Sequence, residues 1–210
     1  GDQAQALKNA GLSRVTVSFD STVEEVYKTM NGRDFGTERV LAGIAAAEAV
    51  CLDPIKINAV VQKGVNDHTI VDLARHFKGT GHIVRFIEFM DVGTVNSWDA
   101  DSVVTASEIA RTINAEFPIT RAAPGYPGEV ATRWTYDDGS GEIGIISSVS
   151  EPFCGDCTRA RLSTDGQLVT CLFAAGGKDL KSPMRSGATD AELLELMTGI
   201  WSTRKDRYSE

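Results

Sequence analysis

Short segments rich in β-branched residues alternate with helical patterns over the first 90 residues, and this alternation constrains the fold most strongly. Residues 15–19, 55–61 and 83–90 have the composition of strands, and apolar residues recur at helical spacing between them. Strands separated by helices are typical of βα units, whose strands lie parallel in one sheet. The first half therefore predicts part of a (β/α) barrel or part of a doubly wound sheet.

Polar residues indicate where the helices of this half begin. The capping-box sequence of residues 21–24 predicts a helix that starts there and runs toward Met30. Residues 40–47 carry apolar side chains at helical spacing and predict a second helix. Asn66 can cap a third helix, whose apolar face comprises Ile70, Leu73, Ala74 and Phe77.

The pattern changes near Trp98, and we divide the chain there into residues 1–98 and residues 99–210. The capping box of residues 105–108 opens a helix, and a final helical pattern includes Leu193 and Trp201. Two hairpins are predicted from strand-like pairs around glycine-bearing turns. The hairpin strands are residues 132–136 with 142–147, and residues 159–163 with 167–172. The second part is thus an α+β region with β-hairpins.

Three of the four cysteines, Cys154, Cys157 and Cys171, cluster in this second part. The first two form a C-x-x-C pair, and the second hairpin returns Cys171 toward it. In a reducing compartment such a set favours a metal site over a disulfide framework. Three thiolates are too few for a closed structural zinc site. Either a fourth ligand comes from the other half (Cys51, His68, His76 or His82), or a four-iron cluster keeps one iron open.

Two arginines follow the C-x-x-C pair directly. In a strand, Arg159 and Arg161 would project to the same side, and paired guanidinium groups suit a di- or triphosphate. The alternative is that both pair with acidic neighbours, namely Asp156, Asp165 or Glu151.

Polar residues also interrupt the predicted strands of the first half. Lys56 and Asn58 alternate on the second strand, and Arg85 and Glu88 lie on the third. Polar side chains that point into a barrel usually belong to its site. The alternative is a buried ion pair between Lys56 and Glu88 that serves only the structure.

Composition excludes several functional classes. The formal net charge of −8 argues against a nucleic-acid partner, which needs a basic face. No apolar stretch reaches the length of a membrane span, and no secretory signal is visible, so we expect a cytoplasmic protein without a membrane partner.

Four segments together closely resemble one known family. They are residues 85–93 (RFIEFMDVG), 141–146 (GEIGII), 153–162 (FCGDCTRARL) and 171–173 (CLF). Their order and spacing are similar to those of the GTP 3′,8-cyclases of molybdenum cofactor biosynthesis, which are radical S-adenosylmethionine enzymes. The resemblance covers nearly the whole chain, and its cysteine–arginine block is highly specific.

The resemblance implies a fold and a reaction. The fold is an incomplete (β/α) barrel of the TIM type, followed by a C-terminal region that carries an iron–sulfur site. In this family, reductive cleavage of S-adenosylmethionine at an N-terminal [4Fe-4S] cluster generates a 5′-deoxyadenosyl radical. That radical removes the ribose 3′ hydrogen of GTP, and the carbon radical attacks C8 of the guanine. An electron donor is a further implied partner, and the protein would be a monomer or homodimer.

The resemblance also assigns residues. The ligands of the C-terminal [4Fe-4S] cluster match Cys154, Cys157 and Cys171, and its open iron takes the guanine edge. The GTP contacts match Lys56, Arg159, Ala160 and Arg161. The S-adenosylmethionine contacts match Ser18 and Met90, and Arg85 matches a barrel arginine that faces the substrate.

Two departures from the family pattern matter. The N-terminal C-x-x-x-C-x-x-C motif of the radical cluster is missing, since Cys51 stands alone, and so is the family's glycine-ended C-terminal tail. The chain is therefore expected to be an internal fragment that is inactive by itself. The alternatives are a radical enzyme whose auxiliary cluster serves peptide modification, and a non-catalytic zinc-stabilised binding module.

Overall fold

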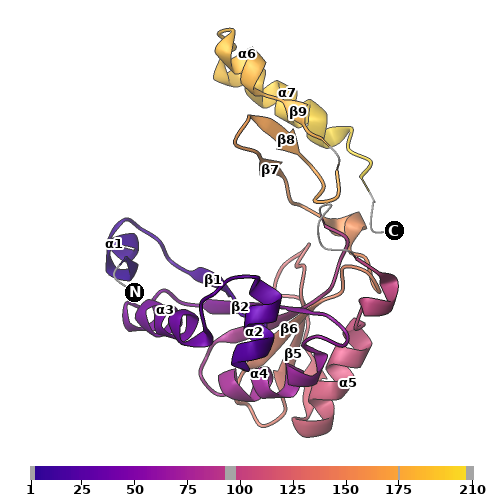
Figure 1. Cartoon of the computed structure of the whole chain (residues 1–210). Coiled ribbons are helices and arrows are strands. Elements are labelled where there is room, and N and C mark those ends of the chain that lie inside the picture. Colours follow the sequence, from indigo (N-terminus) through magenta and orange to yellow (C-terminus); the bar gives the residue numbers. More distant parts are fainter. Residues whose placement is uncertain (1–2, 93–97, 175, 207–210) are drawn as a thin grey trace. The chain divides into compact units, whose positions relative to one another are not determined.

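The computed structural model describes residues 3–92, 98–174 and 176–206. The chain divides into two compact units (Figure 1). The first unit comprises Gly1–Met90 and Trp98–Glu151, and the second comprises Asp91–Ser97 and Pro152–Glu210. Among the described residues, no helix is long and apolar enough to cross a membrane.

The first unit is a mixed α/β structure built on one sheet. Its strands are β1 (Val15–Ser18), β2 (Ile55–Val61), β3 (Ile83–Glu88), β4 (Ile119–Arg121), β5 (Thr132–Tyr136) and β6 (Glu142–Ile146). Its helices are α1 (Ala4–Asn9), α2 (Glu24–Asn31), α3 (Thr37–Ala49), α4 (Ile70–Phe77) and α5 (Ala106–Glu116), with single turns η1 (Asp67–Thr69) and η2 (Ala100–Ser102).

The strand order is β1-β2-β3-β6-β5-β4, with β1 and β4 at the two edges. Strands β1, β2, β3 and β6 are parallel to one another, as the βα pattern predicts. Strand β5 pairs antiparallel with β6, and β4 pairs antiparallel with β5. The predicted strands and the first hairpin are confirmed. The parallel sheet therefore receives its fourth strand from the hairpin, which lies beyond the predicted boundary.

One face of the sheet is the core of this unit. On β2 every second side chain is buried, from Ile55 to Val61, and on β3 Val84 and Phe86 continue this layer. Helix α3 packs on β1 and β2, while α4 and α5 pack against β3. The alternating residues between the buried ones point to the opposite face of the sheet.

Two of the predicted helix caps are wrong. Helix α2 begins only at Glu24, because the Ser21 hydroxyl accepts from the Val23 amide in a local turn and the Glu24 carboxylate binds Thr37. Asn66 likewise makes no side-chain cap to the turn that follows it, since its carboxamide is used elsewhere. The predicted capping box at Thr105 and Glu108 is confirmed at the start of α5.

The described residues of the second unit form a small antiparallel sheet and two α-helices. The strands are β7 (Arg161–Leu162), β8 (Gln167–Val169) and β9 (Lys178–Asp179), and the helical segments are η3 (Cys154–Asp156), α6 (Lys181–Arg185) and α7 (Asp190–Ser202). The predicted second hairpin and final helix are confirmed. The third strand, β9, is too short and polar to stand out in the sequence.

The structural division differs from the predicted boundary near residue 98. Residues 98–151 belong to the first unit, because β6 pairs with β3 and thereby draws the hairpin and α5 into that unit.

Candidate functional site

A row of neighbouring side chains crosses the face of the sheet opposite the core. The strand register places Ser18 beside Asn58, Asn58 beside Arg85, Arg85 beside Gly144 and Gly144 beside Arg133. Register neighbours project to the same side of a sheet. Residues far apart in the sequence are thus brought into one polar row on four strands and the hairpin strand β5.

Gly144 gives this row its shape. A Cβ atom at this position would lie 3.1 Å from Cγ of Arg85 and 3.1 Å from Cβ of Ala131. Such contacts are tighter than ordinary van der Waals spacing. The missing side chain therefore allows the Arg85 stem to lie across β6.

A pocket of about 80 Å³ lies on this face. Its charged and aromatic lining residues are Lys56, Arg85, Tyr126, Glu129, Arg133 and Glu142. Arg133 is paired with Glu142 through Nε and Oε2 at 3.2 Å. Lys56 and Arg85, both predicted site residues, thus share one pocket.

Among the described residues, neither Lys56 nor Arg85 forms an ion pair. Burial lowers the pKa of Lys56, and the positive charges of Arg85 and Arg14 lower it further, while the negative charges of Glu129 and Glu142 act in the opposite direction. Burial also lowers the pKa of Arg85. Glu129 and Glu142 line the same pocket and offset part of this positive charge, so three cations (Lys56, Arg85 and Arg133) face two carboxylates there. The remaining excess of positive charge favours the binding of an anionic group.

Asn58 orients the arginine of this pocket. The Nε of Arg85 donates to Oδ1 of Asn58 at 2.8 Å. This bond uses the Nε–H donor of the guanidinium group. The N–H donors on Nη1 and Nη2 take no part in the bond to Asn58. The sequence shows that Asn58 shares a face with Lys56, but the pairing with Arg85 depends on the register of β2 and β3.

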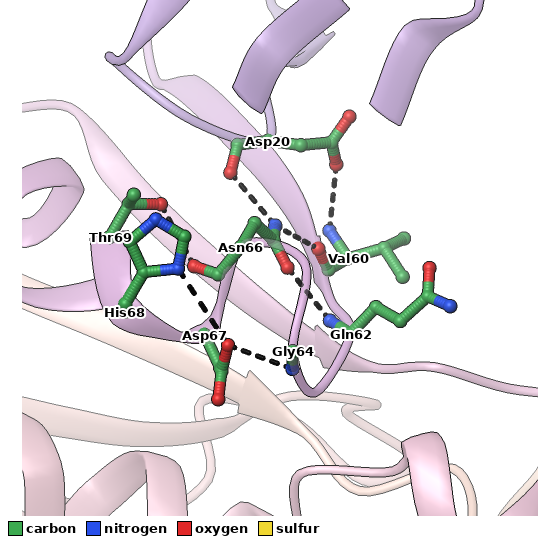
Figure 2. A network of polar contacts seen from close by, with 8 residues as sticks. All are labelled: Asp20, Val60, Gln62, Gly64, Asn66, Asp67, His68 and Thr69. Carbon is green, nitrogen blue, oxygen red and sulfur yellow. Dashed lines mark hydrogen bonds and ion pairs between the residues drawn. The ribbon is translucent and has the colours of Figure 1, made fainter. Parts of the chain in front are cut away.

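A polar network connects the segment after β1 with the end of β2 (Figure 2). Oδ1 of Asp20 accepts from the Val60 amide at 2.9 Å. The buried Asn66 donates to the carbonyl oxygens of Asp20 and Val60, and its Oδ1 accepts from the Gln62 amide. The network therefore ties the segment that follows Ser18 to the end of the neighbouring strand.

Glu88 does not pair with Lys56, so the ion-pair alternative is wrong. The two residues lie on opposite faces of the sheet, because Glu88 continues the buried layer of Val84 and Phe86. The Glu88 carboxylate is fully buried and accepts from the amides of Ala106, Val149 and Ser150 at 2.6–2.8 Å. Glu88 thus joins the end of β3 to the start of α5 and to the segment after β6.

The two predicted S-adenosylmethionine contacts lie at strand ends in the same unit. Ser18 is the last residue of β1 and is exposed. Met90 is half-buried and follows the end of β3 by two residues. Both lie at the carboxyl ends of parallel strands, where sites of α/β folds are built.

The three clustered cysteines lie in the second unit as free, half-buried thiols. Cys154 begins the single turn η3, and the Cys157 amide donates to the Cys154 carbonyl oxygen at 3.3 Å. Cys171 lies in the turn after β8. Within the described residues, no three His, Cys, Asp or Glu side chains are grouped closely enough to hold a metal ion.

Arg159 lies directly on the C-x-x-C pair. Its Nε and Nη2 each lie 3.4 Å from Sγ of Cys157, and its guanidinium group stacks 4.9 Å from the centre of the Phe153 ring. Arg161 is exposed at the start of β7, after the exposed Ala160. The observed strand β7 thus begins two residues later than predicted, and Arg159 lies outside it. Strand geometry therefore does not place Arg159 and Arg161 on the same side. Neither arginine forms an ion pair in the described part of the chain.

The Cys157 thiol has thiolate character near neutral pH. Burial, the largest influence, raises its pKa, but the hydrogen bonds from Arg159 and Arg204 and the charge of Arg159 together lower the pKa to about 7. A thiolate is the form that binds metals and clusters.

Comparison with known proteins identifies the family. The family model described as Molybdenum Cofactor Synthesis C matches residues 82–210, and the model of the Radical SAM superfamily matches residues 1–77. Proteins named GTP 3′,8-cyclase are similar over almost the whole chain. The one from Xanthomonas axonopodis pv. citri is 50% identical over 208 residues, and the one from Staphylococcus saprophyticus is 45% identical over 207 residues.

These matches cover 99% and 98% of this chain, but 62% and 61% of the relatives. The chain thus spans about three-fifths of the length of the relatives it matches. A relative from Acidothermus cellulolyticus, also 50% identical, is covered over 58% of its length. Since one family model covers more than half of the chain, the chain belongs to the Molybdenum Cofactor Synthesis C family.

Proposed function

We propose that this chain is the larger part of a GTP 3′,8-cyclase, which converts GTP to (8S)-3′,8-cyclo-7,8-dihydroguanosine 5′-triphosphate by radical S-adenosylmethionine chemistry. The observation that carries the proposal is the pocket where Lys56 and Arg85 lie together, neither of them in an ion pair with another described residue. With a volume of about 80 Å³, that pocket suits one anionic or polar group of a larger substrate, and the names of the relatives point to GTP.

The proposed roles in the first unit follow from the polar face. Lys56 contacts GTP through its ammonium group, and Arg85, held by Asn58, faces the substrate as a catalytic residue. Ser18 and Met90 contact S-adenosylmethionine at the carboxyl ends of β1 and β3. The parallel strands would form part of an incomplete (β/α) barrel whose inner face is this polar face.

The proposed roles in the second unit follow from its thiols and guanidinium groups. The donor chemistry of Cys154, Cys157 and Cys171 fits a [4Fe-4S] cluster, because all three are free and Cys157 is readily a thiolate. When bound, this cluster would supply an iron with an open position for the guanine edge. Arg159 and Arg161, with Ala160 between them, would hold the triphosphate.

Two partners belong to the proposed whole protein. S-adenosylmethionine, with a second [4Fe-4S] cluster, would supply the radical chemistry, and an external donor would supply electrons. The protein around the radical intermediates would exclude water from them.

A binding measurement tests the pocket assignment. Equilibrium dialysis of the full-length, anaerobically reconstituted protein against GTP is expected to show affinity losses of about tenfold to a hundredfold for Lys56→Ala and Arg159→Ala, since each substitution removes a charge-assisted contact with GTP. Thr135→Ala is the matched control, because Thr135 is exposed on the same sheet. Unchanged GTP affinity in both Lys56→Ala and Arg159→Ala would refute the assignment.

A further inference from the structure

A largely buried arginine after the last helix contacts the C-x-x-C segment. Nη1 of Arg204 donates to the carbonyl oxygen of Cys157 at 2.7 Å, although 47 residues separate the two. The Arg204 side chain is only 11% exposed, and its guanidinium group lies 4.9 Å from the centre of the Trp201 ring at the end of α7. Packing against α7 therefore holds the guanidinium group against Cys157.

The same arginine is linked to the segment that carries Cys171. Nε of Arg204 lies 3.4 Å from Oδ2 of Asp206, and that oxygen accepts a hydrogen bond from the Thr170 hydroxyl. Thr170 immediately precedes Cys171. Arg204, Asp206 and Thr170, referred to below as the clamp, thus connect the backbone of Cys157 with the residue before Cys171.

The clamp spans a gap that the local structure leaves open. The β7–β8 hairpin separates the two cysteine segments along the chain, and its strands are paired over only two residues each. Such a short ladder sets the spacing between its two ends weakly. A buried guanidinium group with two differently directed bonds fixes that spacing more firmly, since the guanidinium fork is planar and rigid.

We infer that Arg204 and Asp206 are positioning residues for an iron–sulfur cluster on Cys154, Cys157 and Cys171. They hold the C-x-x-C segment and the Cys171 segment at a set spacing, so less chain entropy is lost when the three thiolates bind iron. Residues that orient metal ligands in this way typically change metal affinity about tenfold to a hundredfold when they are replaced. This inference rests on the proposed function only for the presence of the cluster.

Iron retention tests the clamp. The chain of residues 1–210, in which Cys51 is the only further cysteine, and its variants are reconstituted anaerobically with iron and sulfide and titrated with an iron chelator, and the absorbance near 400 nm is followed. For Arg204→Ala and Asp206→Ala, we expect half of the cluster to be lost at about tenfold less chelator than in the unsubstituted protein. The double variant is expected to match the weaker single variant, because either substitution already breaks the clamp. Lys205→Ala is the control, since this neighbouring cation is exposed.

A conservative variant separates positioning from general stability. Arg204→Lys keeps the charge but cannot bond Cys157 and Asp206 at once, so its cluster retention should fall between those of Arg204→Ala and the unsubstituted protein. The thermal unfolding of the cluster-free forms is measured in parallel, and we expect it to differ little between Arg204→Lys and Lys205→Ala.

Two results would overturn the inference, and they have different meanings. If the unsubstituted protein retains its cluster and Arg204→Ala retains it equally well, the clamp has no positioning role and the cluster assignment stands. If the unsubstituted protein takes up no iron, the cluster assignment of the proposed function fails, and the clamp inference fails with it.

Discussion

Asp20 lies two residues after the end of β1, and its carboxyl group is partly buried. Burial raises its pKa above the ordinary value of 3.8, and the hydrogen bond from the Val60 amide offsets only part of this shift. The folded state consequently binds the proton more tightly than the unfolded state does. Stability contributed by this group is therefore highest at low pH and decreases as the pH rises from 3.8 through the raised pKa.

Asp20→Asn should raise the stability of the protein at pH 7. The asparagine oxygen can still accept from the Val60 amide, while the charge that burial disfavours is removed. Thermal unfolding at a series of pH values is expected to show a higher melting temperature for the variant at pH 7 and a smaller difference near pH 3.5. A lower melting temperature of Asp20→Asn at pH 7 would contradict this reading.

At the scale of the element, Glu88 connects three segments of the first unit. Its carboxylate accepts the first free amide of α5 and two amides after β6, so it satisfies backbone donors that no strand or helix bond could reach. The same carboxylate lies at the N-terminus of α5, where a negative charge interacts favourably with the helix dipole. The end of β3 is thereby fixed just before Met90.

Glu88→Ala should destabilise the first unit by about 2 kcal/mol or more, because its amide partners lose their acceptor in a buried setting. Glu88→Gln keeps one acceptor oxygen and should cost less. Urea unfolding of both variants measures the two losses. Thr105→Ala, which removes only the side-chain cap of α5, is a suitable comparison at about 1 kcal/mol. A loss for Glu88→Ala no larger than that for Thr105→Ala would contradict the role assigned to Glu88.

Gly144 is where one element makes room for a functional side chain of another. In Gly144→Ala the new methyl group would press on the Arg85 stem and on Ala131 at 3.1 Å, so the guanidinium group must shift. We expect GTP affinity to fall by a factor of about three to ten, with only a small change in melting temperature. Isothermal titration with GTP checks this, and unaltered affinity would show that Arg85 needs no clearance at β6.

At the scale of the whole molecule, the sequence predicts the elements better than their connections. Alternating apolar residues locate β2 correctly, since period and composition are local properties. The row from Ser18 to Arg133 could not be predicted, because it depends on the register of five strands. The two wrong caps have a related cause: Ser21 and Asn66 have suitable side chains, but nearby backbone groups compete for them.

The candidate site shows the same division. The spacing of the cysteines and arginines in residues 153–162 can be recognised in the sequence. The bond from Arg204 to Cys157 cannot, because it joins segments that are 47 residues apart and share no local pattern. Likewise, the sequence shows that Lys56 and Arg85 are polar residues on strands. Only the fold shows that they line one pocket with Arg133 and Glu142.

Turnover by the full-length protein that contains residues 1–210 tests the central claim most directly, since this chain by itself lacks the cysteine motif of the radical cluster. The protein is reconstituted anaerobically with iron and sulfide and incubated with GTP, S-adenosylmethionine and dithionite, and 5′-deoxyadenosine and the cyclised nucleotide are measured together. The account predicts that both products form in equal amounts, that omission of GTP abolishes the cyclised nucleotide, and that Lys56→Ala lowers its yield. A colourless protein that holds one zinc ion and forms neither product would contradict the account.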